Sequence, residues 1–218
     1  MIEKERTGEK SSLKHSLFLL GDSGVGKSYF FRKIKGTKID KTLVSTLGVD
    51  KSTIYYKKFN DEDEDKDLKD AEMQLVDSSG NNKYLEVVKE YIKESDAAIV
   101  FYDITNAQSV ERVGHWINAM KEETKDKNGY TFFLIGNKKD LVEENQNSRQ
   151  VSEDEAKKIC KEKNLEWLGE ISAKNFTQEQ LLEIFWEIFK KIRNNMPIEK
   201  KTEPSENKKK KGCCPCLG

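Results

Sequence analysis

Short apolar runs alternate along this chain with longer segments in which apolar residues recur at helical spacing. The short runs predict buried strands, and two further segments of strand character, close together in the chain, predict a hairpin. The predicted strands are residues 17–20, 52–59, 72–76, 97–101, 131–135 and 165–171. The predicted helices are residues 29–35, 84–93, 107–125, 153–162 and 178–194.

Strands and helices in this alternating order predict the fold class. We expect an α/β protein of three layers, in which a six-stranded, mostly parallel sheet carries helices on both faces. Along the chain we expect a disordered extension (1–14), one folded domain (15–196) and a basic tail (197–218). The acidic run at residues 60–70 is expected to form the solvated tip of the hairpin, with docking of a partner as the alternative.

Composition limits the partners and the location. The 218 residues include 39 Lys plus Arg and 39 Asp plus Glu, so no overall field favours nucleic acid as a partner. No apolar run approaches the roughly 20 residues that a membrane span needs, and residues 1–14 lack the apolar core of a signal peptide. We therefore expect a cytosolic protein, and a monomer.

Residues 21–28, Gly-Asp-Ser-Gly-Val-Gly-Lys-Ser, match the phosphate-loop pattern G-x-x-x-x-G-K-[ST] between a predicted strand and a predicted helix. In this context backbone N–H groups and the helix dipole converge on one point. Lys27 is expected over the β- and γ-phosphates and Ser28 on Mg²⁺, with Gly24 and Gly26 leaving room for the phosphates. A plain glycine-rich turn is the alternative. The expected nucleotide contacts here are Ser23, Gly24, Val25, Gly26, Lys27, Ser28 and Tyr29.

Two later loops select the base. Residues 137–140, Asn-Lys-Lys-Asp, follow a buried strand, where open α/β sheets bind ligands. The Asp140 carboxylate can accept both N1–H and the exocyclic amine of guanine, a donor pair that adenine lacks. Asn137 would brace the loop, and the stem of Lys138 would cover the ring. In the second loop, Ser172, Ala173 and Lys174, the Ala173 N–H can reach guanine O6. GTP and GDP are thus the expected ligands, with an ATP-using kinase as the alternative.

Three further residues complete the phosphate end. Thr46 lies nineteen residues after Lys27, in the loop that follows the first helix, and its hydroxyl could join Ser28 on Mg²⁺. Asp77 ends a predicted strand and would hold Mg²⁺ through water, while the N–H of Gly80 could meet the γ-phosphate. Contacts of this kind order two loops in one nucleotide state and release them in the other. An ordinary loop hydroxyl and a strand-end turn former are the alternatives for Thr46 and Asp77.

Together these motifs make the chain resemble the small GTPases of the Ras superfamily, and most of all their Rab branch. The resemblance covers about residues 17–193 and includes the helix of Trp116; its motifs are residues 21–28, 45–50, 102–105, 136–141 and 172–174. It implies the Ras-like P-loop NTPase fold, GTP or GDP with Mg²⁺, exchange factors, activating proteins and effectors. It also implies a role in vesicle traffic at the cytoplasmic face of intracellular membranes, with partners bound through residues 37–51 and 77–92.

The chain also departs from that family. Asn81 stands where relatives carry the glutamine that orients the attacking water, which predicts slow hydrolysis by a catalytic set of Lys27, Thr46, Gly80 and Asn81. A binding module with negligible turnover, acting as a scaffold, is the alternative. Ile39 stands where relatives stack an aromatic ring on guanine, so nucleotide is expected to be held more loosely. No arginine is placed in the sequence as a catalytic finger, so a partner would supply one.

The tail combines charge with cysteine. Residues 208–211 are four lysines, and Cys213, Cys214 and Cys216 follow within the last six positions. A polybasic stretch attracts an anionic leaflet but needs a lipid for stable anchoring. The three cysteines are therefore expected to be lipidation sites, although the ending matches neither a C-a-a-X box nor the usual Rab termini. A metal site, which would lack a fourth ligand, and free thiols are the alternatives.

Overall fold

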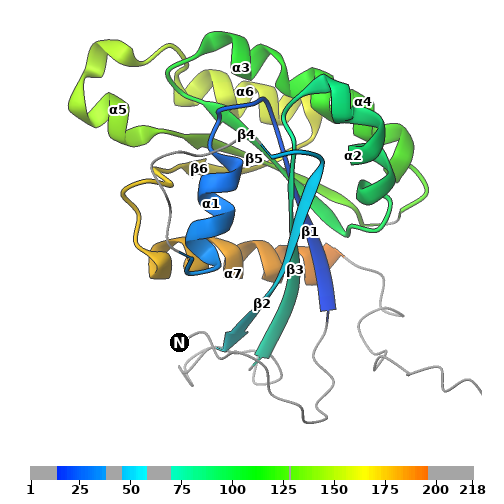
Figure 1. Cartoon of the computed structure of the whole chain (residues 1–218). Coiled ribbons are helices and arrows are strands. Elements are labelled where there is room, and N and C mark those ends of the chain that lie inside the picture. The colour runs from blue at the N-terminus through cyan, green and yellow to red at the C-terminus, as the bar shows by residue number, and fades with distance from the viewer. Residues whose placement is uncertain (1–13, 38–45, 58–69, 128, 196–218) are drawn as a thin grey trace, which may run out of the picture.

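The computed structural model describes residues 14–37, 46–57, 70–127 and 129–195. Within these residues six strands form one sheet in the order β2-β3-β1-β4-β5-β6 (Figure 1). Strand β2 pairs antiparallel with β3, and the other neighbours pair in parallel. The strands are β1 (Lys14–Leu20), β2 (Val49–Lys57), β3 (Asp70–Ser78), β4 (Ala97–Asp103), β5 (Thr131–Asn137) and β6 (Glu166–Glu170). The predicted six-stranded, mostly parallel sheet and its hairpin are confirmed.

Alternation along the central strands divides the core between the two faces of the sheet. Leu17 and Leu19 of β1 lie in one cluster with helices α1 (Lys27–Ile34) and α7 (Gln178–Asn195). Phe18 and Leu20 lie in the other, with α2 (Leu85–Ile92), α4 (Val113–Thr124) and α6 (Glu153–Lys163). Since side chains alternate between the faces of a strand, a fully apolar strand supplies both clusters. The three-layer α/β class is therefore confirmed (Figure 1).

Several helix bounds differ from the prediction. The single helix predicted at residues 107–125 is two helices, α3 (Ala107–Glu111) and α4, which meet at Arg112 with a ψ of −8°. Helix α5 (Lys139–Glu144) and two short 3₁₀ turns, Asn82–Tyr84 and Gln146–Ser148, were not predicted, because so few residues show no apolar period. Helix α6 begins at Glu153, as predicted, after the N-cap Ser152, whose Oγ accepts the Glu155 N–H at 3.2 Å.

Strand β3 runs further than its apolar pattern. The predicted strand ends at residue 76, but β3 continues through Ser78. Asp77 is paired with Leu19 of β1 on one side and with Asp50 of β2 on the other. Its backbone is therefore held by two neighbouring strands rather than by a turn.

Several predictions concern residues outside the described part of the chain. They are residues 1–13 of the predicted extension, Ile39, positions 60–69 of the acidic run and the tail with its three cysteines. The last residue of that extension, Lys14, is not disordered as predicted but begins β1. Among the described residues, no helix is both long and apolar enough to cross a membrane.

Candidate nucleotide-binding site

A cavity of about 480 Å³ opens where the carboxyl ends of β1, β3, β5 and β6 lead into their loops. Most of the predicted site residues line it: Ser23, Gly24, Gly26, Lys27, Ser28, Tyr29, Thr46, Gly80, Asn81, Asn137, Lys138, Asp140, Ala173 and Lys174. Val25, Asp77 and Ser172 do not line it but bond to residues that do. Five lining residues were not predicted as site residues: Leu47, Ser78, Ser79, Tyr84 and Leu141.

The phosphate loop packs closely against two other loops of the site. A Cβ on Gly26 would lie 2.0 Å from Asn137 Nδ2, and a Cβ on Gly80 would lie 2.3 Å from the Ser23 nitrogen. At Gly24 the reason for glycine is different, because a Cβ there would meet no protein atom within 4 Å, whereas its φ of 82° is one that other residues rarely adopt. Gly26 and Gly80 are thus glycine because a side chain would collide with Asn137 or with the phosphate-loop backbone, and Gly24 because of its left-handed backbone.

The side chain of Lys27 bonds back to the backbone of the phosphate loop. Its side chain is buried, and Nζ donates to the carbonyl oxygens of Gly21 at 2.7 Å and Asp22 at 2.8 Å. Burial lowers the pKa of Lys27 to about 8, and the carboxylates of Asp77 and Asp22 oppose that shift only in part. A desolvated ammonium gains by contact with phosphate oxygens, so the loop is prepared for an anion.

We expect this pKa to couple nucleotide binding to a proton in magnesium-free solution. Phosphate oxygens favour the charged ammonium and raise the pKa of Lys27, so a neutral amine must gain a proton when the nucleotide binds. With a starting pKa of about 8, GDP binding at that pH should take up about half a proton, and the affinity should fall as the pH rises further. Calorimetry in two buffers of different ionisation enthalpy measures the uptake; equal heats in both buffers would contradict it.

Three oxygen-bearing side chains meet beside the loop. Ser28 Oγ lies 2.9 Å from Thr46 Oγ1, which donates to Asp77 Oδ2 at 3.1 Å. The other oxygen of Asp77, Oδ1, is buried with no hydrogen-bond partner in the described residues, and burial raises the pKa of this carboxyl group. Hard oxygen donors and an unsatisfied carboxylate oxygen are what Mg²⁺ prefers, so the residues fit that ion.

The base-side loops are held by one amide. Asn137 Nδ2 donates to the Val25 carbonyl at 2.7 Å, and Asn137 Oδ1 accepts the Ala173 N–H at 3.0 Å. Asn137 therefore ties the phosphate loop to the loop that was predicted to contact guanine O6. Because the Ala173 N–H is already donated, a bond from it to O6 would be a shared, three-centre bond.

Asp140 presents a buried carboxylate to the cavity. Ser172 Oγ donates to Asp140 Oδ1 at 2.7 Å, and Lys174 Nζ lies 3.6 Å from Oδ2. The whole residue is 4% exposed. These contacts fix the plane of the carboxylate, which leaves its remaining lone pairs for a ligand.

Asn81 lines the cavity, but its side chain bonds within its own turn. Its Oδ1 accepts the Lys83 N–H at 3.0 Å and so caps the 3₁₀ turn Asn82–Tyr84, while its own N–H donates to Ser79 Oγ at 3.3 Å. The residue predicted to orient a water molecule is therefore held by its own turn.

Helix α4 reaches the outer side of the phosphate loop. Asp22 Oδ1 accepts Trp116 Nε1 at 2.8 Å and lies 3.0 Å from Arg112 Nε, and Arg112 Nη2 donates to Asn82 Oδ1 at 3.2 Å. No arginine lines the cavity in the part of the chain that the structure describes.

The surface expected to bind partners carries charge. Lys51 Nζ lies 4.3 Å from the centre of the Tyr91 ring and 3.3 Å from Glu94 Oε2. Val76, beside Asp77 in β3, is 2% exposed and adds no apolar surface there.

The fold and the cavity define a P-loop nucleotide-binding protein of the α/β class. Comparison with known proteins gives the family. The family model described as "Ras family" matches residues 16–194. The chain is also 32% identical over 200 residues to the GTP-binding protein YPT52 of Saccharomyces cerevisiae, covering 83% of this chain and 82% of that protein. The chain therefore belongs to the Ras family of small GTPases, and its Rab-like character is confirmed.

Proposed function

We propose that this protein is a Rab-like molecular switch that binds GTP or GDP with Mg²⁺ and recruits effectors to intracellular membranes in vesicle traffic. One observation carries the proposal: the phosphate loop, the oxygen cluster and the base-side carboxylate of Asp140 meet around one cavity. The chain's similarity to a yeast protein named as GTP-binding supports it. Exchange factors, activating proteins and effectors are the partners that such a switch needs.

The proposed reaction is in-line attack of water on the γ-phosphate. Lys27 Nζ and the backbone N–H groups of the phosphate loop stabilise the negative charge that develops on the phosphate oxygens. Bound Mg²⁺, held by Ser28, Thr46 and Asp77, would neutralise charge on the β- and γ-phosphates. The Gly80 N–H would meet the γ-phosphate, and Asn81 would orient the attacking water only poorly, because its Oδ1 already accepts the Lys83 N–H.

Two segments connect the reaction to partners. Thr46 and Gly80 precede the start of β2 and follow the end of β3, respectively, and both line the cavity. Their γ-phosphate contacts exist only in the GTP state, so hydrolysis releases both segments at once. Partners that bind residues 37–51 and 77–92 would then read the nucleotide state.

Slow hydrolysis is part of the proposal. Asn81 is one methylene shorter than glutamine, and its oxygen already caps the Lys83 N–H. A second function, a GTP-binding scaffold with negligible turnover, is favoured by the same observation. GDP appearance over hours, compared with the rate of nucleotide exchange, separates the two.

The nucleotide that co-purifies with the full chain tests the proposal. Protein purified with magnesium should carry GDP or GTP in about equimolar amount, and EDTA should release most of it because the oxygen cluster then loses its cation. Adenine nucleotides in place of guanine nucleotides would contradict it.

The tail is proposed to anchor the switch to membranes. Cys213, Cys214 and Cys216 would carry the lipid, and four nearby lysines would add roughly 1 kcal/mol each at an anionic leaflet. We expect protein isolated from eukaryotic cells to float with phosphatidylserine vesicles, and the triple Cys→Ser variant to stay in solution. Cys160→Ser is the matched control, because that cysteine is buried in the core and should not affect flotation. Flotation of the triple variant would contradict the proposal.

A further inference from the structure

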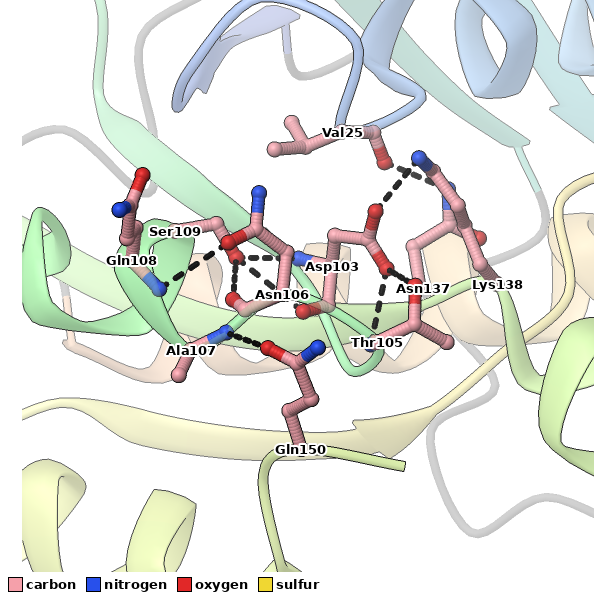
Figure 2. A network of polar contacts seen from close by, with 10 residues as sticks. All are labelled: Val25, Asp103, Thr105, Asn106, Ala107, Gln108, Ser109, Asn137, Lys138 and Gln150. Atoms are coloured by element: carbon pink, nitrogen blue, oxygen red, sulfur yellow. Dashed lines mark hydrogen bonds and ion pairs between the residues drawn. The ribbon is translucent and has the colours of Figure 1, made fainter. Parts of the chain in front are cut away.

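A buried carboxylate lies behind the base-side loop. Asp103, at the end of β4, is 6% exposed, and its Oδ2 lies 2.5 Å from Lys138 Nζ. Its Oδ1 accepts both the N–H of Thr105 at 2.9 Å and the Thr105 hydroxyl at 2.7 Å (Figure 2). Both oxygens are therefore engaged, one of them with a residue of the nucleotide cavity.

The backbone that carries Asp103 is itself braced. Ser109 Oγ accepts the Asp103 N–H at 2.9 Å and lies 2.7 Å from the Asn106 carbonyl oxygen. Asn106 caps helix α3 through the Gln108 N–H, and Gln150 Oε1 accepts the Ala107 N–H at 3.1 Å (Figure 2). The carboxylate of Asp103 is thus fixed from the side away from the cavity.

Lys138 is the residue that this carboxylate holds. It adopts a left-handed backbone conformation with a φ of 72°, which is unfavourable for lysine, and it stands immediately before helix α5. In that conformation it lines the cavity between Asn137 and Asp140. The neighbouring strands add a backbone bond from the Ile104 N–H to the Asn137 carbonyl oxygen at 3.1 Å.

We propose that Asp103 is a positioning residue for the bound base: it holds the Lys138 side chain across the purine site and so slows the release of nucleotide. The proposal rests on the proposed guanine-nucleotide function. Asp103 lies behind Lys138 and acts only through it. The opposing explanation is that the pair stabilises the fold alone, since breaking any buried ion pair is destabilising.

A double-mutant cycle on release of a fluorescent GDP analogue separates these explanations. Asp103→Asn keeps the shape of the side chain and removes its charge, and Lys138→Met keeps the lysine stem and removes the ammonium group. With magnesium and excess unlabelled GDP, each single variant is expected to release nucleotide about tenfold faster, and the double variant no faster than Lys138→Met. Unchanged release in Asp103→Asn, or effects that multiply in the double variant, would overturn the proposal.

Two further variants of the full chain make the test specific. Arg149→Gln breaks another ion pair, with Arg149 Nη1 2.7 Å from the buried Glu170, and neither residue lines the cavity. It is expected to lower the melting temperature but leave the release rate unchanged. Faster release from Arg149→Gln would show that the loss of any ion pair speeds release, and would overturn the specific role of Asp103.

Thr105→Val removes one donor to Asp103 without leaving a charge unpaired. It should speed release a few-fold even if Asp103→Asn does not fold, and an unchanged release rate would count against the proposal.

The outcome for the wild type distinguishes this inference from the function on which it rests. Wild-type protein that takes up the GDP analogue, with Asp103→Asn releasing it at the same rate, would overturn the positioning role alone. Wild-type protein that takes up no GDP analogue would overturn both.

Discussion

Asp140→Asn is expected to reverse the base preference of the site. The carboxylate can accept two hydrogens from guanine, and an amide can accept one but presents a donor in place of the other acceptor. Sites that are built on such buried hydrogen bonds discriminate by roughly 10⁴-fold, so GDP affinity should fall by about that factor. Xanthosine diphosphate, which carries a carbonyl at the position of the guanine amine, should gain affinity over the wild type. Equilibrium titration with both nucleotides measures this.

Lys139→Met is the matched control for that change. Lys139 precedes Asp140 in the first turn of helix α5, and it does not line the cavity. Its substitution should leave the ratio of the two affinities unchanged. Equal ratios of GDP to xanthosine diphosphate affinity in Asp140→Asn and the wild type would contradict the role of Asp140 in base selection.

Asn81→Gln is expected to speed single-turnover GTP hydrolysis by roughly 10²-fold. Misplacement of a catalytic group by about 1 Å costs a factor of this size, and asparagine is shorter than glutamine by one methylene. The longer side chain would also leave the Lys83 N–H, which Asn81 now caps at 3.0 Å, and extend toward the phosphate end of the cavity. Release of phosphate from protein preloaded with GTP measures the rate.

Asn82→Gln makes the same chemical change one residue later. Asn82 accepts Arg112 Nη2 at 3.2 Å and does not line the cavity, so hydrolysis should stay at the wild-type rate. No acceleration in Asn81→Gln would show that the position does not limit the reaction. Hydrolysis absent from both the wild type and Asn81→Gln would favour the scaffold function.

The sheet could be predicted from the sequence because its central strands are apolar on both faces. Runs such as 97–101 admit few other structures in a chain of this composition. Helix α5 and the break at Arg112 could not be predicted in this way. The first is six residues long and follows a left-handed residue, Lys138, and the second falls at Arg112, whose side chain pairs with Asp22 ninety residues earlier in the sequence. Contacts between residues far apart in the sequence produce no periodic pattern of apolar residues within a segment.

The candidate site also has residues that the sequence predicts and residues that it does not. Lys27, Asp140 and Asn137 belong to short motifs in which the chemistry fixes the residue type, so the sequence sufficed to place them at one cavity. Asp103 lies in a motif at residues 102–105 that resembles Rab proteins, and the motif assigns it no role of its own. Its ion pair with Lys138 depends on the pairing of β4 with β5, which places Asp103 beside Asn137. Recognising that pairing requires the sheet order, which the strand pattern does not contain.

Nucleotide binding by the stripped full chain tests the central claim most directly. After removal of bound nucleotide with EDTA, the protein is titrated in magnesium with fluorescent GDP, and GTP and ATP are added as competitors. We expect binding at or below micromolar concentration, competition by GTP, and no competition by a thousandfold excess of ATP. Failure to take up either guanine nucleotide, or displacement by ATP as readily as by GTP, would contradict the account.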